Sequence, residues 1–233
     1  MCTVTFVKNQ HAVIITSNRD EQVSRKPALP PNSYVIGGQT LYFPKDTQAG
    51  GSWIVFTAAG SAGVLLNGAA EKHEFRTGWR RSRGLVLLDL MSHPDPLAAW
   101  ESYDFDGIEP FTLILYHREA LYQLRWDALC AEQLLVPIDE PQIWSSSPLY
   151  EADVRLWRQQ EFHSCIGSRP LETDIYDFHM RQDREEHRSI RINRGGLKTL
   201  SVTQAIIQNG TVGIQYHDLR DDRRHKLSFT FHR

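Results

Sequence analysis

Cysteine is scarce in this sequence, and long apolar runs are absent. The chain of 233 residues has 3 cysteines, and their odd number and wide spacing, at Cys2, Cys130 and Cys165, suggest neither a disulfide framework nor a paired Cys-x-x-Cys metal site. A reducing compartment fits this pattern better. The longest apolar stretch lies near Leu85 to Leu90, far short of the roughly 20 residues needed to cross a bilayer. We therefore expect no integral membrane segment.

The sequence also lacks an excess of charge of either sign. Its 26 Lys and Arg residues against 28 Asp and Glu residues give a formal net charge of -2 at pH 7. This balance gives no reason to expect a nucleic acid or an anionic membrane as a partner. The first residues show no basic segment followed by an apolar one, so they do not indicate a secretory signal. We expect a cytoplasmic protein with a single domain over residues 1–233, and the sequence indicates no oligomeric state.

Several motifs of cofactor and metal sites are missing. The chain has no Gly-x-Gly-x-x-Gly and no P-loop, and its ten histidines form no His-Glu-x-x-His pattern. We expect no metal and no cofactor, although these absences do not exclude a haem ligand. Residues 59–63 imitate a serine nucleophile elbow, but the residues that follow favour a strand where an elbow requires a helix. We reject that interpretation.

Most of the chain shows the patterns of short strands joined by tight turns. Residues 2–7 and 12–17 are rich in β-formers around a polar turn, and residues 52–57 and 62–67 form a second such pair. Residues 111–117, 120–126 and 130–136 are also β-rich. Asn209-Gly210, between residues 201–208 and 211–218, is a strong hairpin signal, and a last strand is expected at 227–232. The prolines between residues 26 and 32 predict a surface loop.

Helical patterns come in pairs between these strands. Leucine spacing predicts helices at residues 84–93 and 94–103, and a second pair is indicated at 150–165 and 172–182. Strand meanders separated by paired helices predict an α+β protein with antiparallel sheets. Residues 181–194 mix acidic and basic side chains densely, which favours a solvated face or a mobile loop.

Cys2 is the first candidate for chemistry. Methionine is normally removed before a small second residue, which would leave a thiol and a free α-amine on Cys2. An α-amine has an ordinary pKa of about 7.7 to 8.0, so near neutrality it can accept the thiol proton. The plain alternative is a small apolar residue at the start of a strand, and Cys2 alone does not decide between the two.

A dense polar cluster, Asn18-Arg19-Asp20-Glu21, follows the second predicted strand. Strand alternation places Asn18 and Asp20 on one face and Arg19 and Glu21 on the other, provided that the strand continues past Ser17. One of these pairs can face Cys2. There a carboxylate would hold the α-ammonium and an arginine would favour the thiolate, whereas the structural alternative is a salt-bridge cluster at a strand end.

These segments together resemble the NRDE family, which includes the transport-and-Golgi-organisation-two proteins. The similar segments are Met1-Cys2-Thr3-Val4-Thr5-Phe6, Thr16 to Glu21 with Arg25 and Pro27, Gly50-Gly51-Ser52-Trp53-Ile54, and Leu65-Leu66-Asn67. Weaker similarity lies at Ser145-Ser146-Ser147 and at the closing hairpin.

The resemblance implies the four-layer αββα sandwich of N-terminal-nucleophile hydrolases. It implies catalytic roles for Cys2, Arg19, Asp20 and Asn67, with Asn67 as an oxyanion donor, and substrate contacts for Asn18, Trp53 and Ser147. For Asn67 the structural alternative is an asparagine that ends a strand in a turn.

The pattern also departs from that of linear amidases in this superfamily. They carry Arg-x-x-Asp on the second strand where this chain has Asn18-Arg19-Asp20. Ser145-Ser146-Ser147 occupies the place where a second asparagine is common. The C-terminal part of this chain also lacks a clear match to the arginine that those amidases carry there, and only Lys198 and Arg194 are candidates to replace it.

Two functions follow. The first is hydrolysis of a non-peptide amide bond in a small molecule, with Cys2 as the nucleophile. The second is carriage of haem or an acyl lipid without catalysis, a role that does not require a processed Cys2.

Overall fold

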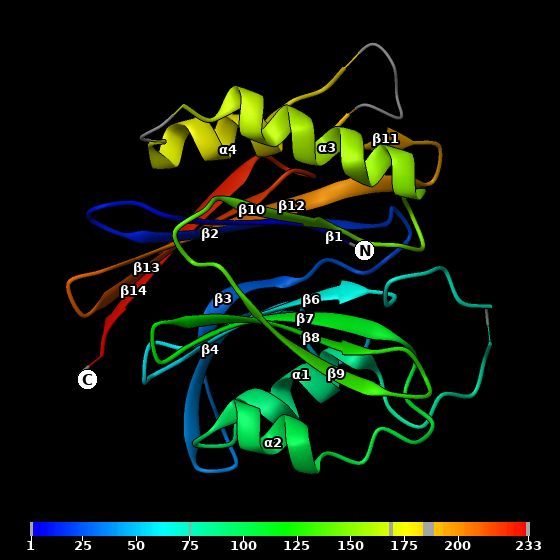
Figure 1. The fold of residues 1–233 in the computed structure, drawn as a ribbon. Coiled ribbons are helices and arrows are strands. Elements are labelled where there is room, and N and C mark those ends of the chain that lie inside the picture. Colours follow the sequence, from blue (N-terminus) through cyan, green and yellow to red (C-terminus); the bar gives the residue numbers. More distant parts are fainter. Residues whose placement is uncertain (1, 75, 168–169, 184–188, 232–233) are drawn as a thin grey trace. The chain divides into compact units, whose positions relative to one another are not determined.

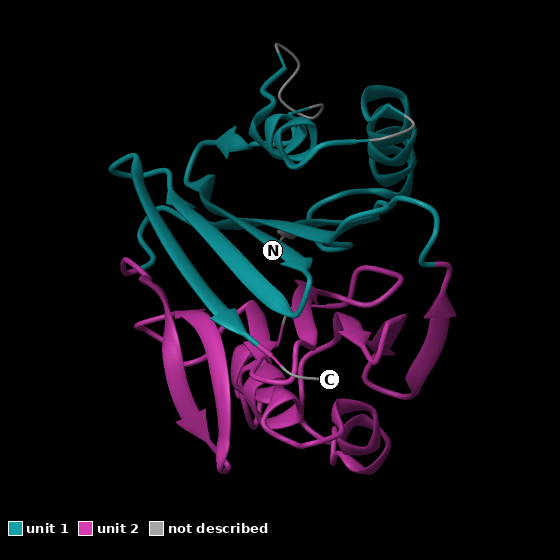
Figure 2. Ribbon diagram, turned by 90° about the vertical axis from the view of Figure 1, so that its left-hand side faces the viewer, with its two compact units in different colours: residues 1–25, 138–230 teal, residues 26–137, 231–233 magenta. Residues whose placement is uncertain are grey.

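The computed structural model describes residues 2–74, 76–167, 170–183 and 189–231. These residues form two compact units (Figure 2). Unit 1 comprises residues 1–25 and 138–230, and unit 2 comprises residues 26–137 and 231–233. The expectation of a single domain stays a prediction. In the described part of the chain, no helix combines the length and the apolarity that a membrane span requires.

Unit 1 is an antiparallel sheet with two helices. Its strands follow the order β10-β1-β2-β12-β13-β14, and the short β11 pairs with β12 (Figure 1). The bounds are β1 Cys2–Lys8, β2 Val13–Gln22, β10 Gln142–Ser145, β11 Asn193–Arg194, β12 Leu197–Gln208, β13 Thr211–Asp218 and β14 Arg223–Thr230. The predicted β1–β2 hairpin is confirmed.

The hairpin predicted from Asn209-Gly210 is confirmed as the connection between β12 and β13. Asn209 has φ 51° and Gly210 has φ 72°, so both central residues take the left-handed conformation that a tight two-residue hairpin turn requires. The local turn chemistry therefore fixes the register of β12 against β13.

Helices α3 (Ala152–Cys165) and α4 (Glu172–Met180) lie on one side of this sheet (Figure 1). A small apolar cluster holds them there, formed by Val7, Ile14, Phe162, Ile166, Ile175, Phe178 and Ile190. Phe162 and Phe178 bring the two helices together, with ring centroids 5.0 Å apart. The same helix–sheet interface also contains many polar side chains.

Unit 2 is a second antiparallel sheet, with strand order β3-β4-β5-β6-β7-β8-β9. The bounds are β3 Leu29–Ile36, β4 Gln39–Lys45, β5 Ile54–Thr57, β6 Ala62–Asn67, β7 Phe111–His117, β8 Ala120–Trp126 and β9 Ala131–Val136. Helices α1 (Arg83–Met91) and α2 (Pro96–Ser102) pack on it through a large apolar core that includes Leu87 and Phe111. Asp95 caps α2 by accepting hydrogen bonds from the backbone N–H groups of Leu97 and Ala98.

The α+β class with two antiparallel sheets and four helices is confirmed. The loop predicted between residues 26 and 32 is wrong in part, because β3 already begins at Leu29. β3 is an edge strand, and a register shift between Leu29 and Asn32 accommodates Pro30 and Pro31, which have no backbone N–H to donate. The sequence analysis also missed β4 and the four-residue β10. Within the segment predicted to be solvated or mobile, residues 184–188 lie outside the described part, whereas β11 is a short strand.

Candidate functional site

The start of β1 lies against the polar cluster of β2. In the β1–β2 register Cys2 pairs with Arg19 and Thr3 pairs with Asn18. Directly opposed residues of an antiparallel pair share a face of the sheet, so the positions of Cys2 and Arg19 share one face and Asn18 lies on the other. β2 continues to Gln22, which confirms the predicted alternation through Asp20. Arg19 and Glu21 therefore share the face of Cys2, and Arg19, which is 4% exposed, is the residue directly opposite Cys2.

Asp20 lies on the opposite face, under the helices, and is fully buried. The hydroxyl of Thr199, its partner in the β2–β12 register, donates to Oδ1 at 2.6 Å. The hydroxyl of Tyr150 donates to Oδ2 at 3.4 Å. Burial raises the pKa of the Asp20 carboxyl above its usual value, and these two hydrogen bonds oppose the shift. Asp20 is therefore a fixed, desolvated carboxyl group.

Arg158 supplies a cation to the same buried region from α3. Its side chain is fully buried, and Nη1 donates to the Thr3 hydroxyl at 2.6 Å while Nη2 donates to the backbone oxygen of Ser189 at 2.5 Å. The guanidinium also lies over the Tyr150 ring, 3.8 Å from the ring centroid. Since Thr3 follows Cys2 directly, Arg158 fixes the residue next to the proposed nucleophile.

The sequence analysis did not single out Arg158, although the sequence holds a signal. Val154, Arg158 and Phe162 follow one another at a spacing of four in the predicted helix of residues 150–165. An arginine within the apolar stripe of an amphipathic helix is unusual, because charged side chains are almost never fully buried without a partner. The presence of Arg158 within this apolar stripe therefore indicates a buried polar contact.

Asn18 joins β2 to α4. Its side-chain nitrogen donates to the backbone oxygens of His179 at 3.0 Å and Ile190 at 3.3 Å, and its side-chain oxygen lies 2.7 Å from Nδ1 of His179. Nε2 of His179 lies 2.8 Å from the Thr5 hydroxyl. Burial lowers the pKa of His179 to about 3, so the ring is neutral near pH 7. The Asn18 contacts are structural, and its contact with a substrate stays a prediction.

The remaining predicted site residues are divided between the units. Ser147 follows β10 in unit 1 and is buried. Trp53 and Asn67 belong to unit 2, where Trp53 is buried just before β5 and Asn67 ends β6 opposite Phe111. The structure therefore brings Cys2, Arg19 and Asp20 onto adjacent strands of one sheet. The roles of Ser147, Trp53 and Asn67 stay predictions.

The Gly50-Gly51-Ser52-Trp53 segment has a structural explanation inside unit 2. A Cβ atom on Gly51 would lie 2.4 Å from the backbone carbon of Gly84, at the start of α1, so only glycine fits this approach. The Ser52 hydroxyl is bonded to the backbone oxygen of Pro44 at 2.7 Å. Packing of α1 thus accounts for Gly51 and Ser52 without a ligand.

The other two cysteines are not part of the polar cluster of β2. Cys130 and Cys165 are exposed free thiols. Among the described residues there is no group of three or more His, Cys, Asp or Glu side chains that could hold a metal ion. Cys2 is the cysteine that the strand register associates with the polar cluster.

Comparison with known proteins gives one family and several similar structures. The model of the Transport and Golgi organisation 2 family matches residues 1–144. No curated protein sequence matches the chain. The structure is similar to that of the Caenorhabditis elegans ortholog of N-acylethanolamine-hydrolyzing acid amidase, with a TM-score of 0.63 and 13% sequence identity over 87% of this chain and 92% of the other.

Two variants of the conjugated bile acid hydrolase from Clostridium perfringens are also similar. An arginine-to-leucine variant matches with a TM-score of 0.56 and a cysteine-to-alanine variant with 0.52, each at 9% identity over 100% of this chain and 97% of the other. At such low identity the likeness shows the fold alone. The fold is therefore the one shared by these N-terminal-nucleophile hydrolases, as the sequence predicted.

Proposed function

The chain belongs to the Transport and Golgi organisation 2 family, and from this premise we propose that it is a cysteine hydrolase of the N-terminal-nucleophile type. Its substrate would be a small molecule with a non-peptide amide bond. The observation that carries the proposal is the pairing of Cys2 with Arg19 at the start of β1. An arginine beside a thiol favours the thiolate, which is the nucleophilic form.

The chemistry uses two groups of one residue. After removal of Met1, the α-amine of Cys2 accepts the thiol proton, and the sulfur attacks the carbonyl carbon of the amide. The tetrahedral intermediate then collapses as the proton passes to the leaving amine, which leaves a thioester on Cys2. Water hydrolyses the thioester, releases a carboxylic acid and restores the thiol.

The buried groups of unit 1 support this role by fixing the start of β1. Thr3 is held by Arg158, and Asn18, the partner of Thr3 in the register, is held by His179. Asp20 is held by Thr199 and Tyr150. A nucleophile whose following residue is held in place loses little freedom when the substrate binds, and such preorganisation lowers the barrier.

The proteins of similar structure indicate which substrates to try first. One protein is described as hydrolysing N-acylethanolamines and the other as hydrolysing conjugated bile acids. Both descriptions indicate compounds in which an acyl group is joined to a small polar partner. We propose N-acyl amides of small amines as the first panel, and Asn67 as a candidate oxyanion donor.

The test is turnover of this panel by the parent chain and by two cysteine variants. Cys2→Ala should abolish release of the amine, whereas Cys165→Ala, at an exposed thiol, should leave it unchanged. Binding of the same amides, and of haem and a fatty acid, should be measured alongside. If Cys2→Ala retains turnover, the proposal is wrong; if the parent binds haem or lipid but hydrolyses nothing, the protein is a carrier.

A further inference from the structure

An unassigned cavity of about 310 Å³ lies in unit 1, near the end of β2. Three cationic side chains line it, those of Arg191, Lys198 and Arg220. Thr199 also lines the cavity, and the same hydroxyl that holds Asp20 accepts a hydrogen bond from the backbone N–H of Ile192. The cavity is thus separated from the buried Asp20 by one side chain.

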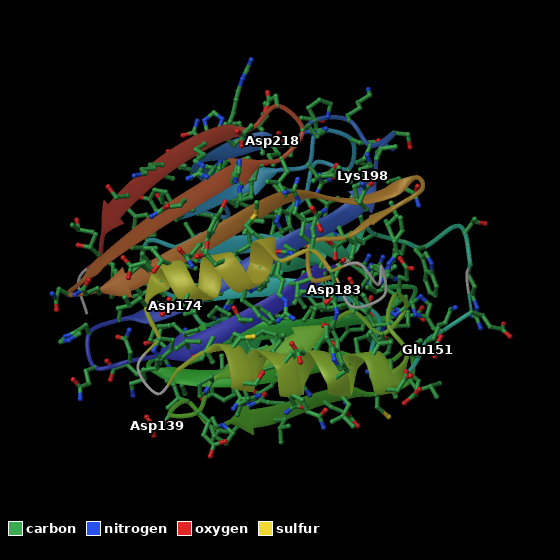
Figure 3. All side chains as sticks on the ribbon, turned by 90° about the horizontal axis from the view of Figure 1, so that it is seen from above. Asp139, Glu151, Asp174, Asp183, Lys198 and Asp218 are labelled. Carbon is green, nitrogen blue, oxygen red and sulfur yellow. The ribbon has the colours of Figure 1, made fainter. Side chains whose placement is uncertain are left out.

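The positive charge of this cavity is only partly compensated. None of its lining residues is acidic. Arg220 is paired with Asp218, whose carboxylate lies 3.2 Å from Nη2. Across the described part of the chain, neither Arg191 nor Lys198 forms an ion pair; Glu21 opposes Lys198 in the β2–β12 register, and its carboxylate accepts the N–H of Gln22 at 2.9 Å. Figure 3 labels Lys198 and Asp218 among the side chains of this unit.

The walls between the cations are apolar and partly closed. Ile192 and Leu200 are buried at the cavity, and Leu219 and Val23 complete the apolar part of its lining. Apolar walls exclude water and strengthen the attraction between a cation and an anion, because the effective dielectric constant is lower there than in bulk water. The side-chain amide of Asn193 provides a further hydrogen-bond donor.

We propose that this cavity binds a small anionic ligand, with its carboxylate or phosphate oxygens on Arg191 and Lys198 and its apolar part against Leu200 and Leu219. The volume is at the lower end of ligand-binding pockets, which suits a short carboxylic acid or a phosphate group. Guanidinium and ammonium groups are the usual partners of these oxygens. The inference stands on the residues of unit 1 and does not depend on hydrolysis by Cys2.

The experiment is a titration of the full chain, followed by amide NMR, at constant ionic strength. Sodium butyrate and inorganic phosphate are added in separate arms, which distinguishes the two sources of anionic oxygens. We expect saturable shifts of the amides of Ile192, Lys198 and Leu200 in at least one arm. The absence of saturation in both arms would overturn the proposal.

Two double variants with the same change in net charge provide the control. Arg191→Gln with Lys198→Gln should weaken binding by about tenfold or more, because two charge-assisted contacts are lost. Lys8→Gln with Lys226→Gln removes two positive charges from the same unit without touching the cavity. If both double variants weaken anion binding equally, the binding arises from general charge attraction, and the proposed site is wrong. Thermal melts should first establish that all variants are folded.

Discussion

The two helix–sheet interfaces of this protein differ in the kinds of side chain that they bury. In unit 2, α1 and α2 pack on their sheet through a cluster of 16 buried apolar residues, whereas the corresponding cluster in unit 1 has 7. Unit 1 instead buries Asp20, Arg158 and His179 between its sheet and its helices. The difference shows that apolar packing holds the helices on the sheet of unit 2, whereas unit 1 combines a smaller apolar cluster with a buried polar arrangement.

A buried polar group contributes less to the stability of a fold than a buried apolar group does. A desolvated charge is tolerated only with partners, and here hydroxyl and backbone groups supply them, as Thr199 does for Asp20 and Thr3 for Arg158. In return, hydrogen bonds have directions, so they fix strand positions more specifically than apolar packing does. The polar interface of unit 1 includes Thr3, the residue that follows Cys2, through its hydrogen bond with Arg158.

The largest expected effect comes from the buried cation. Arg158→Met should lower the free energy of unfolding by about 3 to 5 kcal/mol, because it leaves the Thr3 hydroxyl and the Ser189 carbonyl without their hydrogen-bond donor and removes the buried positive charge near Asp20. Urea denaturation measures the change. The control is Gln159→Met at the exposed neighbouring position of α3, expected to change stability by less than about 0.5 kcal/mol. Similar losses in both variants would contradict the polar account of unit 1.

In unit 2 the comparable effect comes from packing. Leu87→Ala should lower the free energy of unfolding by about 2 to 5 kcal/mol, because it opens a cavity in a fully buried apolar core. Since no titratable group is involved, the loss should be the same at pH 5 and pH 7. A loss that changes strongly between these two pH values would contradict the contrast between the units.

His179 in unit 1 should make the stability of the protein depend on pH, and this is the smallest of the three effects when it is expressed per pH unit. The pKa of His179 falls from its ordinary value near 6.5 to about 3 on folding, so its contribution is complete above pH 6.5 and is lost as the pH falls towards 3. The slope is at most about 1.4 kcal/mol per pH unit for one proton. The raised pKa of Asp20 acts in the opposite sense, because stability is lost as the pH rises through it.

His179→Gln isolates the histidine from the carboxyl group. The difference in unfolding free energy between parent and variant, measured by urea denaturation from pH 7 to pH 4, should shrink or change sign steadily below pH 6.5. A difference that is independent of pH would show that His179 does not titrate on unfolding. Replacement of the exposed His225 by Gln serves as the control.

Much of the fold could be predicted from local sequence patterns. Asn209-Gly210 specifies its hairpin, and β7 and β8 coincide with the predicted residues 111–117 and 120–126 because β-formers end there at clear turns. The prediction failed at β3, where Pro30 and Pro31 suggested a loop, because a proline pair can be accommodated at a sheet edge by a register shift. That edge position is a property of the whole sheet and is not encoded locally.

The candidate site could be predicted only in part. Strand alternation separated Arg19 from Asn18 and Asp20, but the choice of the face shared with Cys2 depends on the register of β1 against β2. Arg158 lies 155 residues from its partner Thr3 along the chain and His179 lies 161 residues from its partner Asn18, so no local pattern relates them. Their roles follow from tertiary packing.

The most direct test of the central claim is the intact mass of the purified protein before and after brief exposure to a thiol-reactive probe, with the labelled peptide mapped. The account predicts a mass that lacks Met1 and labelling that favours Cys2 over the exposed Cys130 and Cys165. A retained Met1 together with an inert Cys2 would contradict an N-terminal nucleophile.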